Sequence, residues 1–231
     1  ITKTLDPFFF FLQLVNMVNG VIKITAVVSF IGYLILVLIE ITRCAYFKGE
    51  FLMAKLFTDG ADIVNFNRVT AGNYDDGSQY DAGGGSDVVT LAQNAAAAAK
   101  AGFKVGSAFY GGAGNDLIYG YDMDDIVYGD IGNDRIYGAA GKDNLFGGAG
   151  NDLILGGDGV DTLRGGSEDD ILYGSDDNDY VYGDDGNDTL KGDGANDTLW
   201  GGADKDTVFG GIGNDHVSGA DGDDIVQAGQ G

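Results

Sequence analysis

The sequence contains very little proline, cysteine, histidine or positive charge. Of its 231 residues, 1 is Pro, 1 is Cys (Cys44) and 1 is His (His216), and 13 Lys and Arg face 36 Asp and Glu. The single Cys excludes an internal disulfide framework, and the single His excludes a His-rich metal site. The net charge of −23 argues against a nucleic-acid partner, because contact with phosphates requires a basic patch. Neither H-E-x-x-H nor G-x-S-x-G occurs, so no catalytic centre is predicted in this chain.

The residues that are present divide the chain into unlike segments. Residues 1–52 are apolar and contain 3 of the 41 Gly, and residues 24–39 form an uncharged run of 16. This run predicts an apolar helix at the extreme N-terminus, slightly shorter than the ~20 residues of a membrane span. It fits a membrane anchor or, less well, a signal peptide. A third hypothesis is that residues 1–52 are an untranslated upstream read-through and that translation begins at Met53. A membrane partner is expected only if the segment is translated.

The second half of the chain is an internal repeat. From residue 111 to 227 a nine-residue unit recurs thirteen times without insertion or deletion. Its first position is always Gly and its eighth is always Ile, Leu or Val. Its sixth position is always Asp, and these residues are the candidate metal ligands: Asp116, Asp125, Asp134, Asp143, Asp152, Asp161, Asp170, Asp179, Asp188, Asp197, Asp206, Asp215 and Asp224.

Each position of the unit has a physical interpretation. Gly at the first and fourth positions is expected to provide turns with positive φ. The eighth residue is expected to point inward from a strand of three residues, so that each unit is a six-residue turn followed by a short strand. Because one unit cannot bury its aliphatic side chain alone, copies must stack. Two units then form a coil of eighteen residues, with odd units in one parallel sheet and even units in the other.

Units such as residues 111–119, Gly-Gly-Ala-Gly-Asn-Asp-Leu-Ile-Tyr, resemble the RTX (hemolysin-type) nonapeptide G-G-x-G-x-D-x-U-x. The resemblance implies an all-β fold, a right-handed parallel β-roll that binds Ca²⁺ in its turns. It also implies export of a bacterial protein by a type I secretion system, and hence an extracellular, secreted or cell-surface location. Each ion would lie between successive turns of one side, held by sixth-position Asp side chains and turn carbonyl oxygens.

Charge explains why such turns need a cation. Asp carboxylates on one side of the roll would repeat at the strand spacing of ~4.8 Å, and each neighbouring pair would repel by about 1 kcal/mol even in water. Thirteen Asp in two rows form eleven pairs, so at most about eleven Ca²⁺ sites are expected, the weakest around 121–123 and 167–177. A turn-forming role without metal would leave this charge uncompensated. The predicted function is therefore calcium binding coupled to folding.

Residues 53–110 are interpreted as a small mixed N-terminal cap of degenerate repeats. Asp62 with Val64, and Asp87 with Val89, keep the acidic and the inward position, and 93–101 predicts a short helix. Residues 111–231 are the β-roll, which stops in mid-repeat and so suggests a fragment. The alternative functions are the repeat region of a larger secreted enzyme, such as a protease or a polysaccharide epimerase, or of a surface adhesin.

Aromatic residues occupy most ninth positions of the repeat. They predict ladders of side chains on the outer faces of the two sheets. Such ladders fit cross-strand stacking, and a sugar-binding or self-association face is the alternative. The residues are Tyr119, Tyr128, Tyr137, Phe146, Tyr173, Tyr182, Trp200 and Phe209.

Overall fold

In the computed structural model, the described residues are the strands of the first 53 residues together with 60–65, 81–93, 97 and 106–231. The chain forms two compact units, Ile1–Ala54 and Lys55–Gly231. In the first unit, three strands form an antiparallel sheet and two further strands form an antiparallel pair. These strands are β1 (Phe11–Val18), β2 (Val21–Phe30), β3 (Tyr33–Ile41), β4 (Cys44–Phe47) and β5 (Glu50–Met53).

The apolar helix predicted at the extreme N-terminus is wrong, because residues 24–30 lie in β2 and residues 33–39 lie in β3. A continuous apolar run does not by itself distinguish a helix from strands, and this run contains four Ile and three Val, which favour strands. The part of the chain that the structure describes contains no helix with the length and apolar character needed to cross a membrane.

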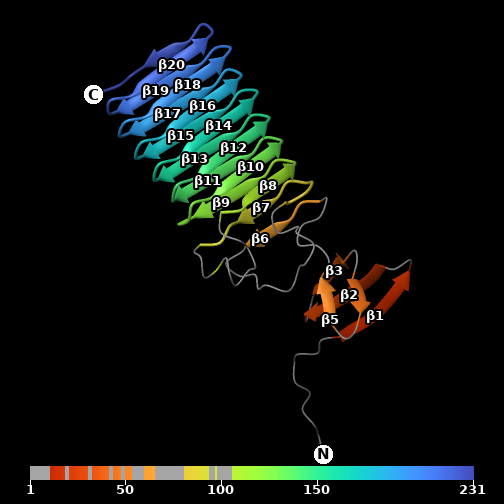
Figure 1. Cartoon of the computed structure of the whole chain (residues 1–231). Coiled ribbons are helices and arrows are strands. Elements are labelled where there is room, and N and C mark those ends of the chain that lie inside the picture. Colours follow the sequence, from red (N-terminus) through yellow and green to blue (C-terminus); the bar gives the residue numbers. More distant parts are fainter. Residues whose placement is uncertain are drawn as a thin grey trace, which may run out of the picture. The chain divides into compact units, whose positions relative to one another are not determined.

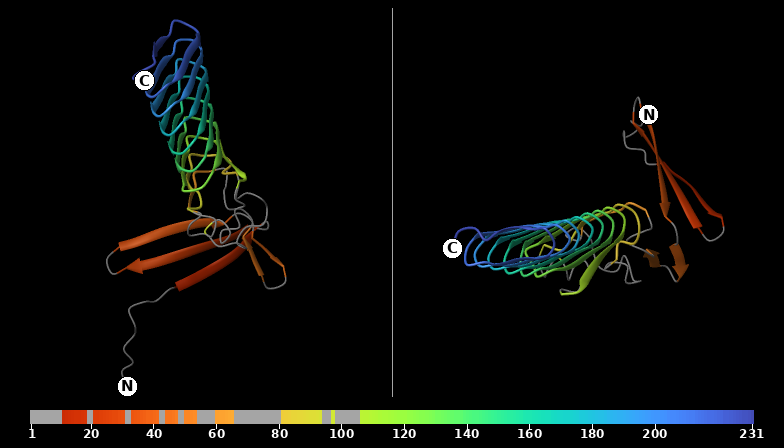
Figure 2. Two further views of the ribbon diagram at one scale, coloured as in Figure 1. Left: turned by 60° about the vertical axis from the view of Figure 1, so that its left-hand side comes forward. Right: turned by 90° about the horizontal axis from the view of Figure 1, so that it is seen from above.

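The second unit is a parallel β-solenoid of about seven coils, in which two sheets face each other (Figure 1). Figure 2 shows the coils stacked one behind another along the unit. The nine-stranded sheet contains β6 (Ile63–Asn65), β7 (Val88–Thr90), β9 (Leu117–Tyr121), β11 (Arg135–Ala140), β13 (Leu153–Asp158), β15 (Ile171–Asp176), β17 (Thr189–Gly194), β19 (Thr207–Ile212) and β21 (Ile225–Gln227). The seven-stranded sheet contains β8 (Ala108–Ala113), β10 (Ile126–Ile131), β12 (Asn144–Ala149), β14 (Thr162–Ser167), β16 (Tyr180–Asp185), β18 (Thr198–Ala203) and β20 (His216–Asp221).

The strand register confirms the predicted coil of eighteen residues. Ile136 pairs with Ile118 on one side and with Ile154 on the other, and all three belong to odd units. Even units pair among themselves in the other sheet, as β10 does with β8 and β12. The sequence period alone therefore sets which strands become neighbours.

The strands of the repeats are longer than predicted. Most span six residues rather than three, because pairing resumes at the second and third positions of the following unit. In β10, Tyr128 pairs with Phe146, the first-position Gly129 is passed over, and Asp130 then pairs with Gly148. The second and third positions were predicted to lie in the turn. In the stacked coils, their backbone groups instead bond to the same positions of the neighbouring coil.

The core is a single file of inward side chains from each sheet. The eighth-position residues from Ile118 to Val208 are at most 1% exposed. Val217 is partly buried, and Val226 in the last coil is 42% exposed because no further described coil covers it. At the opposite end Phe109 is fully buried. Phe109 precedes the thirteen repeats, so the aliphatic pattern did not identify it.

The degenerate repeats ahead of residue 111 extend the nine-stranded sheet. Strand β6 pairs in parallel with β7, and β7 pairs with β9. Val64 and Val89 are buried, as their place in the pattern predicted. Of the predicted helix over 93–101, only Gln93 and Ala97 are described, so that prediction lies outside the described residues.

Candidate metal centre

Positive φ angles define the turns between the strands. They occur at the second position of every repeat and at the fourth position of all but one, which is Met123. Glu168 and Asp177 adopt φ of 73° and 72° at fourth positions, so the turns of 165–170 and 174–179 keep the common conformation. The expectation that first-position Gly provides positive φ is wrong, because no first-position residue is in that region.

The first-position Gly is required for space. A Cβ atom on Gly147 would lie 2.7 Å from the carbonyl oxygen of Gly165 and closer still to Oδ2 of Asp152. The carboxylate of its own turn crowds every other first position, and the backbone of the next coil crowds all of these except Gly174 and Gly219. Within the thirteen repeats only a residue without a side chain fits, which explains why their first position never varies while the positive-φ second position does.

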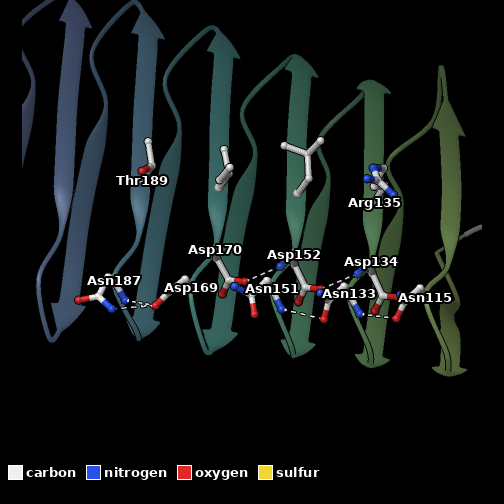
Figure 3. Close-up of a pocket in the computed structure, with 12 residues that line it drawn as sticks. Asn115, Asn133, Asp134, Arg135, Asn151, Asp152, Asp169, Asp170, Asn187 and Thr189 are labelled. Carbon is white, nitrogen blue, oxygen red and sulfur yellow. Dashed lines mark hydrogen bonds between the residues drawn. The ribbon is translucent and has the colours of Figure 1, made fainter.

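The sixth-position Asp side chains form two hydrogen-bonded rows, one along each edge of the roll. The backbone N–H of each Asp from Asp116 to Asp206 donates to Oδ1 of the Asp eighteen residues later, over 2.7–3.0 Å. Figure 3 shows this for Asp134, Asp152 and Asp170. The structure therefore assembles all thirteen predicted residues into the two rows that the repeat implied.

The second oxygen of these carboxylates has no partner among the described residues. Oδ2 is buried and makes no hydrogen bond in twelve of the thirteen predicted residues, from Asp116 to Asp215. Asp224, in the last coil, is more open and is the exception. Such an atom costs free energy unless a cation or a proton satisfies it.

Burial makes these carboxyl groups poor acids. Desolvation, together with repulsion from neighbouring carboxylates, raises the pKa of Asp170 and of Asp179 to about 8. Desolvation likewise raises the pKa of Asp125, Asp152 and Asp161 to about 7. Backbone N–H donors oppose the shift in most of the row without cancelling it. At neutral pH the rows therefore require a compensating positive charge.

The donor atoms at these turns suit calcium. Carboxylate and carbonyl oxygens are hard ligands, the kind that Ca²⁺ takes in sets of six to eight. No group of three or more His, Cys, Asp or Glu side chains converges among the described residues. A cation at a turn would therefore need backbone carbonyl oxygens in addition to Asp side chains.

A groove of about 570 Å³ runs along the odd row of turns (Figure 3). Fifth-position side chains form one wall, where the N–H of Asn133 donates to Oδ1 of Asn115 over 2.9 Å. Asp169 takes the same place further along and accepts two hydrogen bonds from Asn187. This second ladder runs beside the Asp row, and Asn or Asp occupies position five in ten of the thirteen repeats.

The ninth-position aromatic residues stack across strands, as one of the two interpretations predicted. Tyr128 lies between Tyr110 and Phe146, with ring centroids 5.0 Å and 4.5 Å apart and rings nearly parallel. Arg164 and Lys191 continue the ladders by lying over neighbouring Tyr rings.

A two-sheet parallel solenoid with an Asp row at each edge is the architecture of a calcium-binding β-roll. The family model for the RTX calcium-binding nonapeptide repeat (4 copies) matches the chain at residues 108–136, 119–154, 155–190, 182–217 and 205–231. The chain belongs to this family, and its repeat region is a structural, non-catalytic calcium-binding domain. A comparison with curated proteins finds no match.

The raised pKa values predict how the metal-free roll responds to pH. A carboxyl group whose pKa is higher in the folded state penalises folding above that pKa, and the penalty disappears as the pH falls toward the unfolded value near 3.8. In EDTA, strand content measured by far-UV circular dichroism should therefore rise as the pH is lowered from 8 to 5. With Ca²⁺ present, the calcium-induced gain in stability should shrink over the same range. A strand signal in EDTA that falls on acidification would contradict this.

Proposed function

We propose that the sixth-position Asp residues are the calcium ligands and that their loading is coupled to folding of the repeat region. The observation that carries this proposal is the row of buried Oδ2 atoms without partners. Along the row, the backbone N–H and Oδ1 already form hydrogen bonds with neighbouring coils, as they do in Asp152. The missing contact is therefore the one that an ion between the turns would make.

The chain's own residues perform three tasks in this function. First-position Gly lets the carboxylate of each turn and the backbone of the next coil approach closely. The Asp backbone N–H fixes Oδ1 of the next coil, and this orients the free Oδ2. The inward aliphatic residues keep successive coils in register. Bound calcium supplies the positive charge that offsets the buried carboxylates.

Coupled folding and binding supports a location outside the cell. Weak calcium sites of the extracellular class require about 10⁻⁴ to 10⁻³ M free Ca²⁺, far above cytosolic levels. We propose that the chain remains unfolded inside the producing cell, leaves through type I secretion machinery, and folds outside. The family resemblance supports this route, since RTX repeat proteins are generally extracellular.

Substitution of one central ligand tests the proposal. Asp170→Asn keeps the size of the side chain and an oxygen for the N–H of Asp152, but removes the charge. We expect at least one fewer bound Ca²⁺ by equilibrium dialysis, and a higher Ca²⁺ midpoint for folding. In EDTA the variant should be no less folded than the wild type, because it has less repulsion.

The matched control is Asp176→Asn, which removes the same charge from an exposed third position of the following turn. It should leave both the stoichiometry and the midpoint unchanged. Equal calcium binding by Asp170→Asn and the wild type would show that the sixth position does not supply the ligands.

A further inference from the structure

We propose that a calcium site, one that the thirteen repeats do not include, lies between the turn of residues 82–87 and the turn of residues 111–116. Asp87 is its carboxylate on the N-terminal side. This inference rests on the proposed function and extends it to a part of the chain ahead of the residues that the family model matches. It concerns the odd edge of the roll, where β7 precedes β9.

The backbone of residues 82–87 reproduces a repeat turn. Gly83 and Gly85 have φ of 90° and 115°, as second- and fourth-position residues do. A Cβ on Gly112 would collide with the carbonyl oxygen of Gly83, and one on Gly114 with that of Gly85. Second- and fourth-position Gly residues make these same approaches to the preceding coil within the regular repeats.

The hydrogen bonds of this turn also follow the repeat pattern. The N–H of Asp87 donates to Oδ1 of Asp116 over 2.7 Å, and the N–H of Asp62 donates to Oδ1 of Asp87 over 2.6 Å. At the fifth position, the N–H of Asn115 donates to Oγ of Ser86 over 3.0 Å. The turn of residues 82–87 therefore takes part in both hydrogen-bonded ladders on the edge formed by the odd units, the sixth-position Asp row and the fifth-position ladder.

The carboxylate of Asp87 is left in the same state as those of the repeats. Asp87 is 1% exposed, and its Oδ2 is buried without a hydrogen-bond partner. The oxygen can be satisfied by a cation in the gap that faces the turn of Asp116. Because the atom and its surroundings match the regular row, the chemistry that suits calcium there applies here as well.

Two departures from the repeat define the limits of this site. Ala82 replaces the first-position Gly, so the carboxylate of Asp87 shares its turn with a methyl group. On the even edge of the roll the corresponding sixth position is Ser107, which carries no carboxylate. The extension is therefore one site on one edge. Asp87 keeps the acidic position of a degenerate repeat, but it was not among the predicted ligands, because it lies 29 residues before Asp116 instead of 18.

The test compares calcium stoichiometry in the full chain for the wild type, Asp87→Asn and Asp158→Asn, by native mass spectrometry. Asp158 is exposed at a third position and serves as the charge-matched control. We expect Asp87→Asn to bind one Ca²⁺ fewer than the other two proteins. Hydrogen exchange at saturating Ca²⁺ should show lost protection in β7 and unchanged protection in β13, β15 and β17.

Each outcome distinguishes this site from the proposed function. If Asp170→Asn lowers the stoichiometry and Asp87→Asn does not, the row begins at Asp116 and the added site is absent. If the wild type binds no calcium, the proposed function fails and this site fails with it. Loss of β7 protection with unchanged stoichiometry would also overturn the site, because Asp87 would then act only through its hydrogen bond to Asp62.

Discussion

Removal of calcium with EDTA at pH 7.5 should unfold the repeat region of the full chain. Most of the Asp carboxyl groups, whose pKa is raised only to about 6 or 7, would then be charged with an unpaired buried Oδ2, and charged neighbours on the same edge would repel. Titration with Ca²⁺ should restore the far-UV strand signal cooperatively, with a midpoint at about 10⁻⁴ to 10⁻³ M. Trp200, the single Trp, lies in β18 and reports on the roll separately from the N-terminal strands.

Magnesium is the matched control for this titration. Mg²⁺ requires near-octahedral geometry at about 2.0–2.1 Å and retains its water molecules, so it should not induce folding at equal concentration. A roll that is fully folded in EDTA, by both circular dichroism and Trp200 fluorescence, would show that the Asp residues act as turn formers alone. Calcium would then have no part in holding the fold together.

The second large effect is expected from Gly192→Ala. The added methyl group would lie 2.5 Å from the carbonyl oxygen of Gly210 and closer still to Oδ2 of Asp197, a carboxylate whose Oδ1 already accepts a hydrogen bond from Asp179 of the neighbouring coil. The clash is relieved only if the carboxylate of Asp197 shifts or the coils separate, and overpacking of this kind costs about 1–3 kcal/mol or more. Because the clash displaces the carboxylate, the Ca²⁺ midpoint should rise together with the loss of stability in thermal melts.

Gly194→Ala is the control, two residues further along the same strand. A Cβ there would have its nearest neighbour, the carbonyl oxygen of Ser175, at 3.6 Å, and φ is not in the positive region. The substitution should be neutral or stabilise the protein by up to about 1 kcal/mol, because Ala restricts the unfolded chain. Equal loss of stability in both variants would mean that the first-position clash is not what excludes a side chain.

Much of the roll could be predicted from the repeat alone. A period of nine with one aliphatic residue, such as Ile136, and one Asp, such as Asp134, can bury its apolar side chains only by stacking. That requirement yields the two opposed sheets, the eighteen-residue coil and the two Asp rows, all of which the register confirms. The turn oxygens also indicated calcium before any geometry was known.

Some features depended on contacts between coils, which no local pattern encodes. The invariant Gly147 is needed because Asp152 and the next coil crowd it, although its own backbone conformation is ordinary. Asp87 belongs to the Asp row of the odd units although it lies 29 residues before Asp116 and not 18, because β7 pairs with β9. Residues 24–30 and 33–39 form strands although their apolar run fitted a helix equally well. The sequence determined the repeating unit, and close stacking of distant backbones decided which residues each position tolerates and where the Asp row begins.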